Sequence, residues 1–124
     1  MKTISTFSDL ESWKQAHELV ALIYLLTNSF PQTEIYGLTS QLRRASVSVT
    51  ANIAEGFSRF HYKDRLRFYY DARGSLSEVQ SELMDAQNIG ILSKENFDKA
   101  FALTEKVHLI LGGLIRKTTS LTAT

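Results

Sequence analysis

The sequence predicts an all-α fold, an antiparallel up-down-up-down four-helix bundle whose protomer is elongated. Apolar residues recur at intervals of three and four along four segments, which is the period of an α-helix. The single proline, Pro31, lies between the first two segments rather than inside one. The connectors that follow the second and third segments are short, and short connectors join neighbouring helices that run in opposite directions. No segment shows the strict apolar-polar alternation that predicts a β-strand.

The first helix is expected over residues 9–28. Ser8 and Glu11 form a capping-box pattern, in which the serine hydroxyl and the glutamate carboxylate each accept a hydrogen bond from the other residue's backbone amide. Apolar residues then occupy a wide face of the helix, so we expect it to be well buried. The helix should end before Phe30, because a residue that precedes proline disfavours the helical conformation.

The second helix is expected over residues 38–58, and it carries two packing faces. One face should enter the bundle core and consists of Leu42, Ala45, Val49, Ile53 and Gly56. The other face, called the small-residue face below, consists of Val47, Ala51 and Ala54. A helix with two packing faces contacts more than its own bundle, and small residues let two backbones approach closely. We therefore predict that the small-residue face is a subunit interface and that the chain forms a homo-oligomer.

The third helix is expected over residues 63–88, a length of roughly 39 Å that implies the elongated protomer. Gly74 lies inside it, and a glycine there costs ~1 kcal/mol relative to alanine, which is tolerable where another helix crosses closely. One continuous helix is favoured over a break at Gly74, because the apolar residues keep one helical frame on both sides. Gly90 is expected to cap its end, and Ser93 to cap a fourth helix over residues 94–117.

The composition is that of one ordinary globular domain, expected to comprise residues 1–124. The chain contains no cysteine, which excludes disulfides, thiolate metal sites and a cysteine nucleophile. The N-terminus lacks the apolar stretch of a signal peptide. The longest strongly apolar run, residues 19–26, is too short to span a bilayer. We therefore expect a cytoplasmic protein without a membrane partner.

The sequence contains no motif that is typical of an enzyme. A glycine-rich phosphate loop, a G-x-S-x-G nucleophile turn and an H-E-x-x-H zinc motif are all missing. Glu105 and His108 form one Glu-x-x-His step, whereas a di-iron bundle requires two such steps and two further glutamates. We therefore expect no catalytic residues, no metal ion and no cofactor.

Polar residues recur at helical spacing along the second predicted helix and form a line of Gln41, Arg44, Ser48, Asn52 and Glu55. Arg44 and Glu55 are three turns apart, so each needs a partner on another helix, on another subunit or in a ligand. The line is compatible with a ligand site or with a polar network that sets helix register or subunit packing. Polar residues on a packed helix usually satisfy one another, which favours the network.

Positive charge is concentrated in the middle of the chain, although the net charge is only +1. Between Arg43 and Arg73, seven basic residues stand against three acidic ones, a local net charge of +4. Residues 57–70 interleave basic and aromatic side chains, which suits single-stranded RNA because cations neutralise phosphates and rings stack on unpaired bases. The candidate phosphate contacts are Arg59, Lys63, Arg65 and Arg67. The helical spacing of the aromatic residues favours an alternative, in which the rings are core and the charges a solvated face.

Several motifs occur in order between residues 30 and 92: Phe-Pro, Tyr-Gly-Leu, Gln-Leu-Arg-Arg-Ala, Asn-Ile-Ala-Glu-Gly and Gly-Ser-Leu-x-Glu. Through these motifs the chain resembles the small four-helix-bundle proteins encoded in intervening sequences of bacterial 23S ribosomal RNA genes. Val49 and Thr50 depart from the Ile-Pro that this family often has. The polar residues shared with the family are Gln41, Arg43, Arg44, Asn52, Glu55 and Glu78. Together with Ser48 they are the candidates for a polar network or interface.

The resemblance also implies an assembly and a class of partner. It implies a bundle that forms a homopentamer around a central channel and has no enzymatic activity. The family is similar to the accessory proteins of diversity-generating retroelements, which associate with a reverse transcriptase and with nucleic acid. The resemblance therefore implies RNA or a nucleic-acid-handling protein as a partner, besides further copies of the chain.

These observations lead to one principal hypothesis and one alternative. The principal hypothesis is a non-catalytic, homo-oligomeric, pentameric bundle that binds RNA or a ribonucleoprotein through the basic segment. The alternative is a structural or protein-interaction scaffold with no nucleic-acid partner, which the near-neutral net charge and the small-residue face favour. An enzyme site built from Arg44, Asn52 and Glu55 is the least favoured reading.

Overall fold

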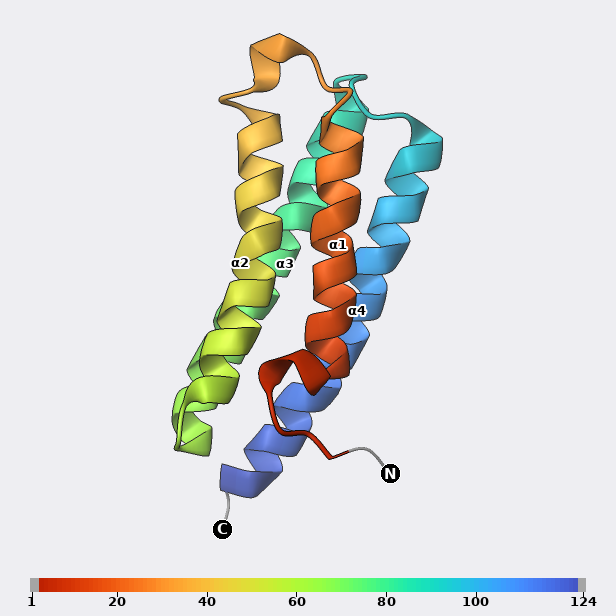
Figure 1. Ribbon diagram of the computed structural model, residues 1–124. Helices are drawn as coiled ribbons and strands as arrows, with labels where there is room; N and C mark the ends of the chain where they lie inside the picture. The colour runs from red at the N-terminus through yellow and green to blue at the C-terminus, as the bar shows by residue number, and fades with distance from the viewer. Residues whose placement is uncertain (1–2, 123–124) are drawn as a thin grey trace.

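The computed structural model describes residues 3–122, and over these residues all regular structure is helical (Figure 1). The long helices are α1 (Glu11–Thr27), α2 (Leu38–Ser58), α3 (Tyr62–Asn88) and α4 (Lys94–Thr122). Two single-turn 3-10 helices, η1 (Phe7–Asp9) and η2 (Gln32–Glu34), precede α1 and α2. The predicted all-α fold is therefore confirmed. The predicted domain ran from residue 1 to residue 124, and its two ends lie outside the described residues.

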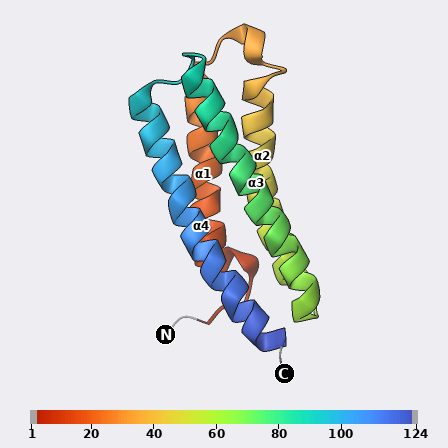
Figure 2. The same cartoon turned by 180° about the vertical axis from the view of Figure 1, so that it is seen from behind.

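Successive helices run in opposite directions, so the chain forms the predicted up-down-up-down bundle (Figures 1 and 2). The connections α1–α2 and α3–α4 lie at one end of the elongated protomer. The α2–α3 turn lies at the other end, where the N-terminal segment and the end of α4 also lie (Figure 1). Each helix packs against two neighbours, and the pair α2–α3 has the most extensive contact.

The core is a column of apolar side chains to which all four helices contribute. Its largest fully buried members are Tyr69, Leu19, Ile23, Leu42, Ile53, Leu76, Leu83, Leu111, Val49, Val79 and Val107. The predicted inner face of α2 is confirmed, because each of its members is buried. Within residues 3–122 no helix has both the length and the apolar character needed to cross a membrane.

Three local features of the helices differ from the sequence prediction. The Asp9 carboxylate, rather than the Ser8–Glu11 pair, caps the N-terminal turn by accepting hydrogen bonds from the Ser5 and Thr6 backbone amides at 2.9 and 3.1 Å. The predicted continuity of α3 through Gly74 is confirmed, but a Cβ atom at that position would meet nothing within 4 Å. No helix of this protomer crosses closely there.

The third difference is that α4 extends to Thr122 instead of ending at residue 117. The Thr118 side chain is buried, and its hydroxyl donates a hydrogen bond to the Leu114 carbonyl at 2.7 Å. The Thr119 hydroxyl donates in the same way to the Ile115 carbonyl at 2.8 Å. The threonines therefore satisfy their hydroxyls against the preceding helical turn, and burial of Thr118 extends the helix.

Both predicted caps of the α3–α4 connection are confirmed. Gly90 has a φ of +86°, the left-handed conformation that glycine adopts without a steric penalty. Its amide donates to the Gln87 carbonyl at 3.0 Å, and the Ile91 amide donates to the Ala86 carbonyl at 3.1 Å. The Ser93 hydroxyl accepts a hydrogen bond from the Asn96 backbone amide at 3.1 Å and so caps α4.

Candidate functional site

The basic and aromatic segment lies at the α2–α3 turn, residues 59–61, at one end of the bundle (Figure 1). The first turn residue, Arg59, donates its backbone amide to the Gly56 carbonyl at 3.1 Å. The His61 carbonyl accepts the Arg65 amide at 3.1 Å, which starts α3. The connection is therefore a tight one, and its backbone is held to both helices by hydrogen bonds.

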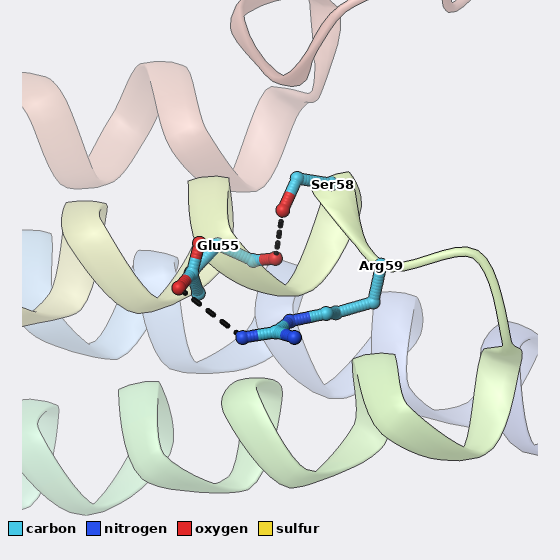
Figure 3. Close-up of polar contacts among 3 residues, drawn as sticks. All are labelled: Glu55, Ser58 and Arg59. Carbon is cyan, nitrogen blue, oxygen red and sulfur yellow. Dashed lines mark hydrogen bonds and ion pairs between the residues drawn. The ribbon is translucent and has the colours of Figure 1, made fainter.

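Arg59, a predicted phosphate contact, is engaged within the turn itself. Its Nη2 atom donates to Glu55 Oε1 at 3.3 Å, and its guanidinium carbon lies 4.7 Å from the centre of the Phe68 ring. The Ser58 hydroxyl donates to the Glu55 carbonyl at 2.6 Å in the same last turn of α2 (Figure 3). The Arg59 side chain is 42% exposed, so the pair with Glu55 is a partly solvated one of modest strength.

Arg65, a second predicted phosphate contact, is packed into the junction between α2 and α3. Its Nε atom donates to the Arg59 carbonyl at 2.8 Å. Its guanidinium carbon lies 4.9 Å from the centre of the Phe57 ring and 5.2 Å from that of Tyr62. Burial raises the pKa of the Tyr69 hydroxyl, and Arg65 beside it acts in the opposite direction. The contacts show that Arg65 holds the turn together, with its charge directed at protein groups.

The remaining two predicted contacts, Lys63 and Arg67, are exposed on α3. They are four residues apart and so lie on the same side of the helix. Two further exposed residues continue this side: Tyr70, and Arg73, whose guanidinium carbon lies 5.0 Å from the Tyr70 ring centre. We call Lys63, Arg67 and Arg73 the basic face of α3. It presents three cations and an accessible ring to solvent.

Phe60 was not singled out by the sequence analysis, yet the fold leaves this residue of the turn highly accessible. The side chain is 88% exposed, and its ring meets that of His61 edge to face at 5.0 Å. Helical spacing classifies a phenylalanine as core, but Phe60 lies between two helices, where that spacing does not apply. Its position in a three-residue connector is the signal that could have revealed it.

A groove between α2 and α3 gathers one part of the predicted polar line. Its volume is about 560 Å³, and its lining includes Gln41, Arg44 and Ser48 from α2 with Ser75, Glu78 and Glu82 from α3. The Ser48 and Ser75 hydroxyls share a hydrogen bond of 2.8 Å across the two helices. The Asn52 Nδ2 atom donates to the Ser48 carbonyl at 2.9 Å and to its hydroxyl at 3.1 Å. These three residues form a polar network that links the two helices.

Glu82, which the sequence analysis did not select, is the most perturbed acid of this groove. Burial raises the pKa of its carboxyl to about 7, and the nearby charges of Glu78 and Asp85 act in the same direction. Its Oε1 atom is shielded from solvent and has no hydrogen-bond partner among residues 3–122. Acidic residues recur at intervals of four and three along α3, at Glu78, Glu82 and Asp85. This spacing is the sequence signal that could have indicated their mutual repulsion.

The other predicted polar residues lie outside this groove. Arg43 points toward α1, where its Nε atom donates to the Thr27 hydroxyl at 2.9 Å and its Nη2 atom to Asn28 Oδ1 at 3.2 Å. Its guanidinium carbon also lies 4.7 Å from the Tyr24 ring centre. Arg43 therefore fastens α2 to the end of α1. Glu55 pairs with Arg59 at the α2–α3 turn instead.

The small-residue face of α2 remains uncovered in the protomer. Val47 and Ala51 are exposed, and Ala54 is half-buried. Ala51 and Ala54 line a shallow hollow with Asn52, Glu55 and Phe68. In the part of the chain that the structure describes, no group of three or more histidine, aspartate or glutamate side chains is arranged to hold a metal ion.

Residues 8–113 match the model of a family described as 23S rRNA-intervening sequence protein. The match begins within η1, covers α1, α2 and α3 entirely and ends within α4, so it includes both the groove and the basic face of α3. None of the curated proteins matches the chain.

Proposed function

This chain belongs to the 23S rRNA-intervening sequence protein family, and from that premise we propose that it is a cytoplasmic, non-catalytic homo-oligomer that binds RNA or a ribonucleoprotein. The family assignment agrees with the resemblance read from the motifs. The similarity to retroelement accessory proteins stays a prediction, and so does the pentameric state. We place the RNA contact on the basic face of α3, beside the α2–α3 turn.

The observation that carries the proposal is the exposure of Lys63, Arg67 and Arg73 on one side of α3. None of the three forms an ion pair or a hydrogen bond within residues 3–122. Arg67 packs on the Phe68 ring at 4.8 Å and Arg73 on the Tyr70 ring at 5.0 Å, and these ring contacts leave the charges without an anionic partner in the protomer. Phosphate oxygens are anions that repeat along a strand and can meet several such cations at once. In a ring of identical subunits, each face would contribute a modest affinity, and several together would bind tightly.

Replacing Lys63 and Arg67 together by glutamine is expected to weaken binding to single-stranded RNA and to flatten its salt dependence. Each lost phosphate contact lowers the slope of log affinity against log salt by about 0.7 on a single strand, so the double variant should lose about 1.4. Fluorescence anisotropy of a labelled RNA at several salt concentrations measures both quantities. We leave Arg59 and Arg65 unchanged in this variant because their contacts hold the turn.

Lys99→Gln is the matched control, since it removes one positive charge from an exposed position near the start of α4, at the opposite end of the bundle. It should leave the salt slope unchanged. An equal slope for the wild type and the double variant would show that the basic face of α3 does not bind phosphate. An absence of RNA binding by the wild type at low salt would overturn the proposal itself.

We place the subunit interface on the small-residue face of α2. Ala51→Glu is expected to reduce the native mass measured by light scattering, because it buries a charge without a partner between two subunits. Ala51 is exposed in the protomer, so the variant should fold and keep its helical circular dichroism. Ala102→Glu places the same charge at an exposed position of α4 and should keep the wild-type mass. If Ala51→Glu also keeps the wild-type native mass, the small-residue face of α2 is not the subunit interface.

A protein-interaction scaffold is the second candidate function, and the packing of Arg59 and Arg65 against protein groups favours it. Two of the four predicted phosphate contacts are thereby committed to the turn, which leaves fewer cations for RNA. Two results together would support this candidate over RNA binding. A partner protein should stay bound after nuclease treatment, and the chain should not bind RNA at low salt.

A further inference from the structure

We propose that the α2–α3 turn is a stacking site for an unpaired RNA base, with Phe60 as the ring on which the base lies. This inference rests on the proposed RNA binding and extends it from the charge of the RNA to its conformation. It assigns a role to the turn, whereas the basic face of α3 supplies the phosphate contacts. The turn lies at the end of the α2–α3 pair in Figure 1.

The first observation is the accessibility of the Phe60 ring. A phenylalanine side chain that stays in water forgoes the favourable free energy of burial that the core residues gain. At 88% exposure, Phe60 makes almost none of the apolar contacts that would recover it within the protomer. Its neighbour His61 contacts the ring edge to face, which positions the ring without enclosing it.

The second observation is that the backbone beneath Phe60 is held by contacts on both sides. Arg65 donates to the Arg59 carbonyl at 2.8 Å, immediately before Phe60, and it packs on the rings of Phe57 and Tyr62. Arg59 is tied to Glu55 at 3.3 Å. The turn is therefore ordered before a ligand arrives, and binding costs little further conformational entropy.

The third observation is the chemistry of the residues that follow Phe60 at the start of α3. Lys63 follows Phe60 by three residues and is exposed, and Arg67 lies one helical turn further along the same side of α3. A hollow of about 530 Å³ adjoins the turn, and His61, Tyr62 and Lys63 are part of its lining. A strand that stacks one base on Phe60 can thus place its phosphates along Lys63 and Arg67.

This arrangement favours unpaired RNA over duplex RNA. In a duplex the base faces are covered by their neighbours, so an aromatic side chain reaches only phosphates and sugar hydroxyls. In a single strand the base face is free, and stacking tolerates any base sequence because every base has such a face. Phe60 should therefore increase affinity for single strands and leave affinity for duplexes unaltered.

The test compares the wild-type chain with Phe60→Ala and Phe60→Tyr on two labelled probes, a single strand of about 12 nucleotides and a duplex of the same sequence. Phe60→Ala is expected to reduce affinity for the single strand by about tenfold, in the range seen when stacking rings are removed. Its affinity for the duplex and its salt slope should stay at wild-type values. Phe60→Tyr keeps a ring and should bind the single strand like the wild type.

The outcomes separate this inference from the proposed function. If the wild type binds RNA and Phe60→Ala binds the single strand equally well, stacking on Phe60 is wrong while RNA binding stands. An equal loss on both probes would also overturn it, because a stacking ring acts on the single strand alone. If the wild type binds neither probe at low salt, both proposals fail. Because Phe60 is exposed, Phe60→Ala should keep the wild-type melting temperature, which verifies that affinity is compared between folded proteins.

Discussion

Replacing Gly56 by alanine is expected to destabilise the protein by about 1–3 kcal/mol, the usual cost of extra volume in a packed interior. A Cβ atom at this position would lie 2.7 Å from Tyr69 Cε1 and 3.0 Å from Phe68 Cβ. Tyr69 is 1% exposed, so the surrounding core leaves its ring little room to move away from the added Cβ atom. The two helices would therefore have to separate where α2 crosses α3.

The close approach at Gly56 also explains why a glycine ends the Asn-Ile-Ala-Glu-Gly element. The residue lies in the last turn of α2, three residues before the α2–α3 turn. Separation of the helices there would shift Phe68, against which the Arg59 guanidinium packs at 4.7 Å. We therefore expect Gly56→Ala to loosen the turn as well as to lower the free energy of unfolding.

Urea unfolding followed by circular dichroism measures the first effect, since a small domain usually unfolds in one cooperative step. Gly74→Ala is the matched control, because it makes the same substitution inside α3 where a Cβ atom meets nothing within 4 Å. It should stabilise the protein by up to ~1 kcal/mol through the higher helix propensity of alanine. Equal stability of the two variants would show that α2 and α3 do not approach each other closely at Gly56.

Replacing Glu82 by glutamine is expected to stabilise the protein at pH 8 and to remove part of its dependence on pH. The pKa of Glu82 is raised from 4.5 to about 7 in the folded protein. Between these two values the folded state binds more protons than the unfolded state, so the free energy of unfolding falls as the pH rises. The contribution is fully present below pH 4.5 and is lost as the pH rises through 7.

Glutamine imitates the protonated carboxyl at every pH, so it removes the cost of the buried charge. At pH 8 we expect a gain of about 1.5 kcal/mol, which includes a reduction for the solvent that screens a half-buried group. Near pH 4.5 the variant and the wild type should differ little. Urea titrations at the two pH values measure the difference.

Glu18→Gln provides the comparison, since it makes the same chemical change at an exposed position of α1. As a surface substitution, it should change the free energy of unfolding by less than about 0.5 kcal/mol at both pH values. A Glu82→Gln variant that follows the wild-type pH dependence would show that Glu82 is solvated and that its pKa is ordinary.

Most of the fold could be predicted because helix formation depends on residues close together in sequence. The bounds of α2 and α3 agree with the predicted ranges to within one residue. The end of α4 was missed because Thr118 is polar and was expected to lie beyond the helix. Its burial depends on neighbours from other parts of the chain, which no local pattern reveals.

Much less of the candidate site could be predicted, as the four cations beside the turn show. Charge alone does not distinguish among the four basic residues Arg59, Lys63, Arg65 and Arg67 in the sequence. In the structure, Arg59 and Arg65 donate hydrogen bonds to protein oxygens, whereas Lys63 and Arg67 are exposed and donate none within residues 3–122. Two acceptors beside the turn make this distinction, Glu55 Oε1 and the Arg59 carbonyl, so it requires knowledge of how the turn is folded.

The sequence by itself determined the helical class, the order of the helices and the family, because these follow from apolar periodicity and from short motifs. Tertiary structure alone decided which polar residues are paired, which acid is buried and which ring is exposed. Ser48 meets Ser75 and Gly56 meets Tyr69 only because α2 and α3 lie side by side. Periodicity depends on neighbours within one helix, whereas burial and hydrogen bonding depend on side chains that folding brings together from distant parts of the chain.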